Sequence, residues 1–419
     1  MIWSILRWLG QVSRRIHVRV ILFAVLNVLA LAIAALLGPV IPAGLGDLIG
    51  ADAVDRILQI IATSMLAVVT FSLTVMVTAF ARSEQQWTPR SHILLREDTR
   101  THSVLATFLG AYIYALIAII MRSADLFGEK EVVILFGMTV LVVVLIVMTM
   151  IGWIVHLEGL GSLPQMARDL EARAVKAVRQ AALQPCQGAN PLTDGTELPG
   201  NAQAVTAKTA GYVQQIFEGA LQDMAQRIDA RFYITVPVGR FVQAGEVIAL
   251  LEGGKAGPQD IAAIRAAIPI DDVRGFDMDP VFGVTVLAEI ATRALSPGIN
   301  DPGTAIDLVY RLSHVMLSGG CGAETDGPTH DRLWIRPIAP AMLFEAGFDP
   351  VARCAGDAVE VHLAIQRALA SVAAGCTGSM AEAARRAADV QGQRGLRLLS
   401  DQHDRARLEA VLLSSVDGS

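Results

Sequence analysis

Long apolar runs in the N-terminal part of the chain constrain its fold more than any other feature. Four such runs lie within the first 155 residues, and no Asp, Glu, Lys or His lies deep within them. They cover residues 20–37, 57–81, 104–121 and 132–154. At about 1.5 Å per residue, each run approaches the roughly 30 Å hydrocarbon thickness of a bilayer. Because a continuous segment satisfies its backbone in lipid only as a helix, the sequence predicts four transmembrane helices over 20–154.

Composition agrees with a membrane protein and excludes one class of partner. The chain is 53% hydrophobic with a mean hydropathy of +0.48, whereas soluble domains contain about 45–50% apolar residues. The net charge is −6 and the chain has no basic stripe. We therefore expect the lipid bilayer as a partner and no nucleic acid.

The distribution of arginine and lysine predicts the orientation. Positive charges precede the first run and follow the second, whereas the loop after the first run has none and the loop after the third has two. The charged positions are Arg7, Arg14, Arg15 and Arg19, then Arg82, Arg90, Arg96 and Arg100, and finally Arg122 and Lys130. Cytoplasmic loops carry the excess of positive charge. We therefore expect a multi-pass protein of the cell membrane with both termini in the cytoplasm.

The first 19 residues form an arm ahead of the first run. Apolar side chains recur at helical spacing, and Trp3 and Trp8 suit headgroup depth. This pattern predicts an interfacial amphipathic helix over 1–19. A cleaved signal peptide is the alternative, but the apolar run is longer than the usual core of about 7–15 residues.

The second run carries four threonines at spacings of seven, four and four residues, which place them on one helix face. They are Thr63, Thr70, Thr74 and Thr78. In one interpretation their hydroxyls bond carbonyls of their own helix or a neighbouring helix. In the other, they line a polar pore in an oligomer.

Five sequence motifs occur in order along the chain. The loop after the second run contains QQWTPR and then an aspartate, which together supply Gln85, Gln86, Trp87, Pro89, Arg90 and Asp98. GYVQ (211–214), GRFVQAG (239–245), DPVFG (279–283) and ALSPGINDPGTA (294–305) follow. In these motifs the chain resembles the domain-of-unknown-function 2254 family of predicted bacterial membrane proteins, over roughly residues 15–350. The resemblance implies a membrane topology and brings no established activity. The chain departs from the family pattern at His102, Ala106 and Arg274-Gly275.

The part after the fourth run predicts a cytoplasmic α/β domain. A connecting helix and a Pro/Gly-rich linker occupy 155–200, a small β-rich module occupies 201–257, and a mainly helical domain occupies 258–419. Strands are expected over 204–216, 231–238, 247–253 and 331–338, and helices over 217–230, 258–294, 302–316, 355–373, 379–399 and 401–414. The turn at 239–246 resembles those of lipoyl- and biotinyl-carrier domains. Such carriers modify a lysine at a hairpin tip, and Lys255 lies beyond the last strand, so we favour an adaptor module.

The stretch RALSPGINDPGTA, residues 293–305, lies between two predicted helices. Asn300 or Asp301 suits an N-cap and Pro302 suits the first helical turn, so a capped turn accounts for every residue. Alternatively, backbone N–H groups at a helix N-terminus hold an anion beside Arg293. This candidate ligand site consists of Arg293, Ser296, Asn300 and Asp301, together with Asp277 and Asp279 one helix upstream.

The remaining chemistry-bearing residues do not favour catalysis. Cys186, Cys321, Cys354 and Cys376 lack metal-ligand spacing, so we expect four free thiols in a reducing compartment and no metal. The chain has no nucleophile elbow, zinc-protease motif or P-loop, and we expect no cofactor and no catalytic residues.

These features together predict a homo-oligomeric membrane protein with channel-like or transport function, gated by its cytoplasmic domain and acting on a small ion or anion. The alternative is a membrane-anchored ligand sensor or enzyme that uses an anion- or metal-binding turn at 296–301.

Overall fold

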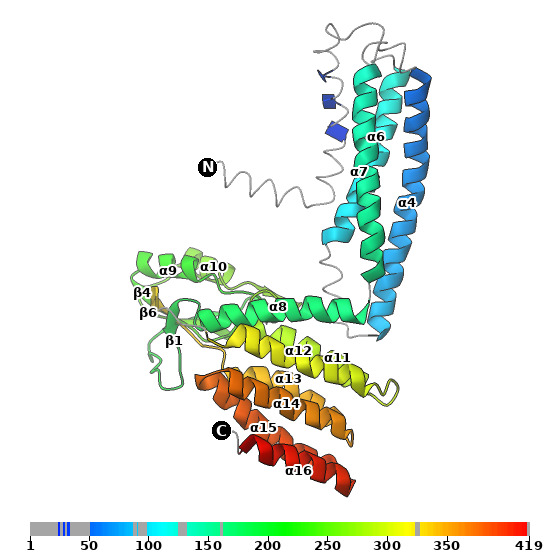
Figure 1. The fold of residues 1–419 in the computed structure, drawn as a ribbon. Coiled ribbons are helices and arrows are strands. Elements are labelled where there is room, and N and C mark those ends of the chain that lie inside the picture. Colours follow the sequence, from blue (N-terminus) through cyan, green and yellow to red (C-terminus); the bar gives the residue numbers. More distant parts are fainter. Residues whose placement is uncertain are drawn as a thin grey trace. The chain divides into compact units, whose positions relative to one another are not determined.

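The computed structural model contains three long apolar helices and a separate α/β unit (Figure 1). It describes residues 24, 25, 28, 29, 32 and 33, and then 51–86, 90, 99–124, 132–159, 162–322 and 327–416. These residues divide into a first unit that ends at Gln165 and a second unit that begins at Met166.

The first unit contains helices whose length and composition suit a bilayer. They are α4 (Ala51–Gln86), α6 (Thr99–Ser123) and α7 (Val132–Gly159). Their membrane-crossing stretches are Asp52–Ala79, Arg100–Ser123 and Val132–Leu157. Three of the four predicted runs thus form helices able to cross a membrane. The first run, 20–37, falls largely outside the described residues, and the predicted arm 1–19 lies wholly outside them.

Large apolar side chains join α4, α6 and α7. Leu58, Phe108, Tyr114 and Leu135 are all fully buried among the three helices. The Tyr114 hydroxyl lies 3.1 Å from Thr139 Oγ1, so the buried phenol has a hydrogen-bond partner. Many aliphatic side chains on the outside of these helices are exposed, which suits contact with lipid.

The second unit contains a five-stranded sheet with the order β1-β8-β4-β6-β2. The strands are β1 (Ala189–Pro191), β2 (Gln203–Thr206), β4 (Ala230–Ile234), β6 (Val247–Gly253) and β8 (His330–Ile335). β6 pairs antiparallel with β2 and β4, whereas β8 pairs parallel with β4 and β1. Tyr233 is opposite Trp334 in the β4–β8 pair, and their rings stack with centroids 4.9 Å apart.

A smaller sheet has the order β5-β3-β7 and is antiparallel throughout. Its strands are β3 (Gly211–Val213), β5 (Phe241–Val242) and β7 (Ile270–Asp271). Two short helices accompany the sheets, α9 (Glu218–Arg227) and α10 (Pro258–Ala266). The predicted helix over 217–230 and the predicted strand over 247–253 are therefore confirmed.

Several elements differ from the sequence-based expectation. The single strand expected over 204–216 is two strands, β2 and β3, that belong to different sheets. The segment expected as a linker contains β1, which pairs with β8. The five-stranded sheet thus takes two strands from outside 201–257, because parallel pairing joins segments that are distant in the chain.

The C-terminal part is a stack of three helix pairs (Figure 1). The pairs are α11 (Pro280–Ala294) with α12 (Pro302–Gly320), α13 (Pro340–Cys354) with α14 (Val359–Gly375), and α15 (Gly378–Leu398) with α16 (Gln402–Val416). Each helix from α11 to α14 contacts the helix two further along the chain. The sequence analysis assigned no element to α13, which contains Gly347 and Pro350 and is held by buried Phe344 and Phe348.

Helix α8 (Leu163–Leu183) packs closely against the first pair of the stack. A Cβ atom at Gly283 of α11 would lie 2.8 Å from the Ala174 Cβ of α8, so the glycine permits the close approach. Glu171 of α8 accepts hydrogen bonds from Arg311 and His314 of α12 at 2.6 and 2.5 Å. These contacts make α8 part of the second unit from Met166 onward.

The cysteines correct one expectation. Cys321 and Cys376, which follow α12 and α14, form a disulfide with a Cα–Cα distance of 4.9 Å, whereas Cys186 and Cys354 are free. The expectation of four free thiols is therefore wrong for one pair. Cysteine spacing did not reveal this pair, because residues 55 positions apart meet only through the packing of the two helices.

Candidate functional site

The four threonines of the predicted pore lie on the exposed face of α4. Each hydroxyl donates to a backbone carbonyl four residues earlier: Thr63 to Gln59, Thr70 to Leu66, Thr74 to Thr70 and Thr78 to Thr74, at 2.8–3.2 Å. All four side chains are exposed within a single copy. The threonine hydroxyls therefore bond carbonyls of their own helix, as the first interpretation expected. Because the four side chains are also exposed, no other element in the described part of the chain covers this hydroxyl-bearing surface.

This threonine face, defined as Thr63, Thr70, Thr74 and Thr78, lies opposite the packed face of α4. At about 100° per residue, the threonines are roughly half a turn around the helix from the buried Val54, Leu58, Ile61 and Met65. The packed side of α4 thus carries large apolar side chains together with the buried Ser72, and its opposite side carries the four threonine hydroxyls.

The turn between α11 and α12 is closed by its own hydrogen bonds. The N–H groups of Ser296 and Asn300 donate to the carbonyls of Arg293 and Ser296, and the Asp301 N–H donates to Ala294 O at 2.8 Å. Asp301 caps α12, with Oδ1 accepting from the Thr304 N–H at 3.0 Å and Oδ2 accepting from the Thr304 hydroxyl at 2.5 Å. Because the turn already uses these N–H groups, its geometry favours the capped-turn interpretation over an anion site.

The structure does not bring the six residues of the candidate ligand site together. Asp279 caps the N-terminus of α11 and Arg293 lies in its last turn, so the 15-residue helix separates them by about 20 Å. Asp277 precedes α11 and lines a cavity, described below. Ser296, Asn300 and Asp301 remain beside Arg293 at the far end of the helix.

Asp279 instead forms a buried junction with Arg274 and the first turn of α11. Its side chain is 2% exposed and is paired with Arg274, whose Nε lies 2.5 Å from Oδ2 and whose second nitrogen lies 3.0 Å from Oδ1. Oδ1 also accepts from the N–H groups of Val281 and Phe282 at 3.1 Å. Burial raises the pKa of Asp279, and Arg274 and the two N–H groups oppose this shift.

Gly239, at the start of GRFVQAG, directly covers this ion pair. Its φ of +81° is in the left-handed region, and a Cβ atom there would overlap Asp279 Oδ2 and lie 2.9 Å from the Arg274 guanidinium. Backbone bonds link the same turn to GYVQ, since Gly239 N donates to Val213 O and Val213 N donates to Arg240 O. Three motifs separated in sequence thus meet at the sheet of β3, β5 and β7.

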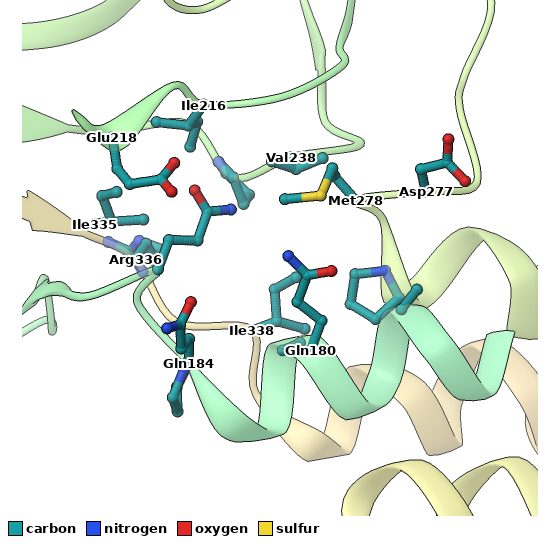
Figure 2. Close-up of a pocket in the computed structure, with 16 residues that line it drawn as sticks. Gln180, Gln184, Ile216, Glu218, Val238, Asp277, Met278, Ile335, Arg336 and Ile338 are labelled. Carbon is teal, nitrogen blue, oxygen red and sulfur yellow. The ribbon is translucent and has the colours of Figure 1, made fainter. Parts of the chain in front are cut away.

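A cavity of about 40 Å³ lies within the second unit at the C-terminal end of α8 (Figure 2). Its polar lining comprises Gln180, Gln184, Gln187, Glu218, Asp277 and Arg336, and its apolar lining includes Ile216, Val238, Met278, Ile335 and Ile338. In Figure 2 the polar ends of Gln180, Gln184 and Glu218 are directed toward one space, whereas the Asp277 carboxylate is turned away. Within the described residues, no three His, Cys, Asp or Glu side chains gather closely enough to hold a metal ion.

Most of the chain matches the model of one protein family. The model of a family of predicted membrane proteins, DUF2254, matches residues 13–371. The chain belongs to this family. Uncharacterized proteins of Mycobacterium bovis and Mycobacterium tuberculosis are each 28% identical to it over 224 residues. That alignment covers 50% of this chain and 42% of each relative, so the chain matches less than half of their length. No solved structure matches the chain.

The structure explains some of the DUF2254 motifs and leaves others undescribed. DPVFG and GRFVQAG build the Asp279 junction. Gln85 and Gln86 end α4, and Arg90 is exposed. Trp87, Pro89 and Asp98 lie outside the described residues, as do the side chains of both glutamines.

The sequence analysis did not single out Gly239, Gln187 or Glu218. The repeated glycines of GRFVQAG were a usable signal for Gly239, because a glycine within a motif marks a close approach or a left-handed backbone. No local signal marked Gln187 or Glu218, since the cavity forms only when α8 meets the strands.

Proposed function

We propose that this protein is a homo-oligomer of the bacterial inner membrane, with both termini in the cytoplasm and a polar path for a small ion along the threonine face of α4. Neighbouring copies enclose the path, and the second unit controls it from the cytoplasm. The observation that carries the proposal is the outward position of the four threonines.

The packing of the first unit supports a path between copies rather than within one. Leu58, Phe108 and Tyr114 are fully buried where α4, α6 and α7 meet, so large side chains occupy the interior of a single copy. A threonine hydroxyl that donates to its own helix keeps acceptor capacity on its outer side. Small and hydroxyl-bearing residues also allow close approach of helices in lipid. The threonine face suits both contact between copies and contact with a hydrated ion.

A direct covalent connection supports control by the second unit. Helix α7 ends at Gly159 and α8 begins at Leu163, so residues 160–162 alone separate a membrane helix from α8. Within the second unit, Glu171 and Ala174 tie α8 to α12 and α11. A shift of α8 in response to a ligand or partner would therefore act on the end of α7.

Ion flux into liposomes tests the path. Thr70→Val with Thr74→Val keeps the side-chain shape and removes two hydroxyls, so we expect flux to fall at least tenfold while the oligomer persists in size-exclusion chromatography. Thr107→Val is the matched control, because Thr107 also bonds a carbonyl of its own helix, Ser103 O at 3.0 Å, but lies on α6. Absence of flux from the wild type, or equal flux from both variants, would overturn the proposal.

Thiol labelling of intact cells tests the orientation. The exposed Cys354 should react with a membrane-impermeant maleimide only after permeabilisation. Gly46→Cys and Gly128→Cys, each placed in a Cys354→Ser chain, should react in intact cells, because they lie in the two loops poor in positive charge. Labelling of Cys354 in intact cells would reverse the proposed orientation.

A further inference from the structure

The cavity at the end of α8 combines a buried hydrogen-bond acceptor, the side-chain oxygen of Gln187, with an apolar wall. The Gln187 side-chain oxygen is buried and has no hydrogen-bond partner among the described residues, although buried polar atoms are normally bonded. This residue has a φ of +53°, so the backbone holds it in a sparsely populated conformation. An acceptor of this kind is suited to a ligand that donates a hydrogen bond.

Charge around the cavity favours a positive ligand. Glu218 is half-buried, its carboxylate is directed toward the space in Figure 2, and it forms no ion pair within the described part of the chain. The last turn of α8 adds the partial negative charge of a helix C-terminus. Arg336 also lines the cavity, but its guanidinium bonds Asp194 at 3.0 Å. An anion in the cavity would lie near the negative charge of Glu218. The arginine that could pair with such an anion, Arg336, already pairs with Asp194.

The size and the wall of the cavity limit the rest of the ligand. A volume of about 40 Å³ accommodates roughly three water-sized groups. Ile216, Val238 and Met278 form part of an apolar wall, which suits a short hydrocarbon chain. The amide groups of Gln180 and Gln184 supply further hydrogen-bonding atoms beside it.

We propose that this cavity is a binding site for a short aliphatic primary ammonium compound. The ammonium group pairs with Glu218 and donates to the Gln187 side-chain oxygen, and the hydrocarbon chain contacts the apolar wall. An alkylamine is protonated at neutral pH, as the lysine side chain is. The inference is independent of the proposed ion path, since it concerns equilibrium binding to the second unit.

Calorimetric titration of the detergent-purified full chain with a series from methylammonium to butylammonium tests the site. We expect saturable binding at one site per chain, strongest for one chain length. The alcohol and the carboxylate of equal length are matched probes, and both should bind at least tenfold more weakly because they lack the positive charge. Equal binding of the alcohol, or no saturable binding of any amine up to millimolar concentration, would overturn the proposal.

Two variants locate the binding. Glu218→Gln removes the negative charge and Gln187→Met removes the acceptor, so each should raise the Kd at least tenfold. Glu345→Gln is the matched control, because Glu345 is an exposed glutamate on α13 that does not line the cavity. Unchanged far-UV circular dichroism and melting temperature establish that each variant folds. Binding that both cavity variants retain would place the ligand elsewhere and refute the assignment.

Discussion

Helices α11 and α12 begin with the same dipeptide, Asp-Pro, and differ in almost everything around it. In both, the aspartate is the N-cap and the proline occupies the first helical turn, and both caps have a φ of −114°. Asp279 of α11 is 2% exposed and its carboxylate bonds Arg274, whereas Asp301 of α12 is exposed and, among the described residues, its carboxylate bonds only the start of its own helix. The local motif sets the start of a helix, and the surroundings decide whether that start also joins distant segments.

The difference has a physical reason. A solvated cap satisfies one or two N–H groups and contributes about 0.5–2 kcal/mol. A buried carboxylate needs further partners, since its desolvation is costly without them. Asp279 receives these partners from the segment before α11, and Gly239 leaves the space that its carboxylate occupies.

The largest effect is expected from filling that space. Gly239→Ala should lower the free energy of unfolding by about 4 kcal/mol, because its Cβ atom displaces the Arg274–Asp279 pair and the backbone is left-handed. Gly245→Ala is the matched control, since Gly245 has a φ of +86° with no atom near its Cβ position, and should cost only about 1–2 kcal/mol. Denaturant unfolding of the full chain in detergent measures both. Equal losses would mean that the contact with Asp279 contributes nothing.

Removal of the buried carboxylate should have the next largest effect. Asp279→Ala leaves Arg274 and two N–H groups without their acceptor, and we expect a loss of about 3 kcal/mol. A double-mutant cycle with Arg274→Ala should give a coupling energy above about 1 kcal/mol. Additive losses in the cycle would contradict the assignment of Asp279 and Arg274 as a coupled pair.

The exposed cap should matter less and should depend on pH. Asp301→Ala should cost about 1 kcal/mol at neutral pH. Hydrogen bonds from Thr304 lower the pKa of Asp301 below its ordinary value of 3.8. The folded-state pKa is therefore the lower one, so the contribution is complete above pH 3.8 and is lost as the pH falls through the folded value. Unfolding measured from pH 7 to pH 3 checks this, and a wild-type–variant difference that stays constant over the range would argue against it.

The smallest effect is expected from a glycine at Asn300, the residue before the exposed cap. Asn300 has a φ of +49°, a conformation that asparagine tolerates and glycine adopts freely. Asn300→Gly should change the free energy of unfolding by no more than about 0.5 kcal/mol, whereas Asn300→Val should cost about 1–2 kcal/mol. Thermal unfolding of the two variants distinguishes them. A large loss with glycine would assign the asparagine side chain a role that its exposed position does not indicate.

The sequence alone determined the features that depend on short segments. Apolar length predicted the helices of α4, α6 and α7, because the cost of exposing backbone in lipid acts on every such run. A cap at Asn300 or Asp301 with Pro302 in the first turn was also predicted, since a cap is recognised within four residues, and the structure has Asp301 as the cap. The family resemblance was evident from ALSPGINDPGTA and the other motifs, and the family match confirms it.

Tertiary structure alone decided which of these segments meet. It paired β8 with β1 and β4 and joined Cys321 to Cys376. It also placed Gly239 on the Asp279 carboxylate and left the Gln187 oxygen, in a cavity, without a partner in the described part of the chain. Local patterns carry the energies of turns, caps and single helices. Contacts between residues tens of positions apart arise only when those elements pack, and the cavity at the end of α8 consists of such contacts.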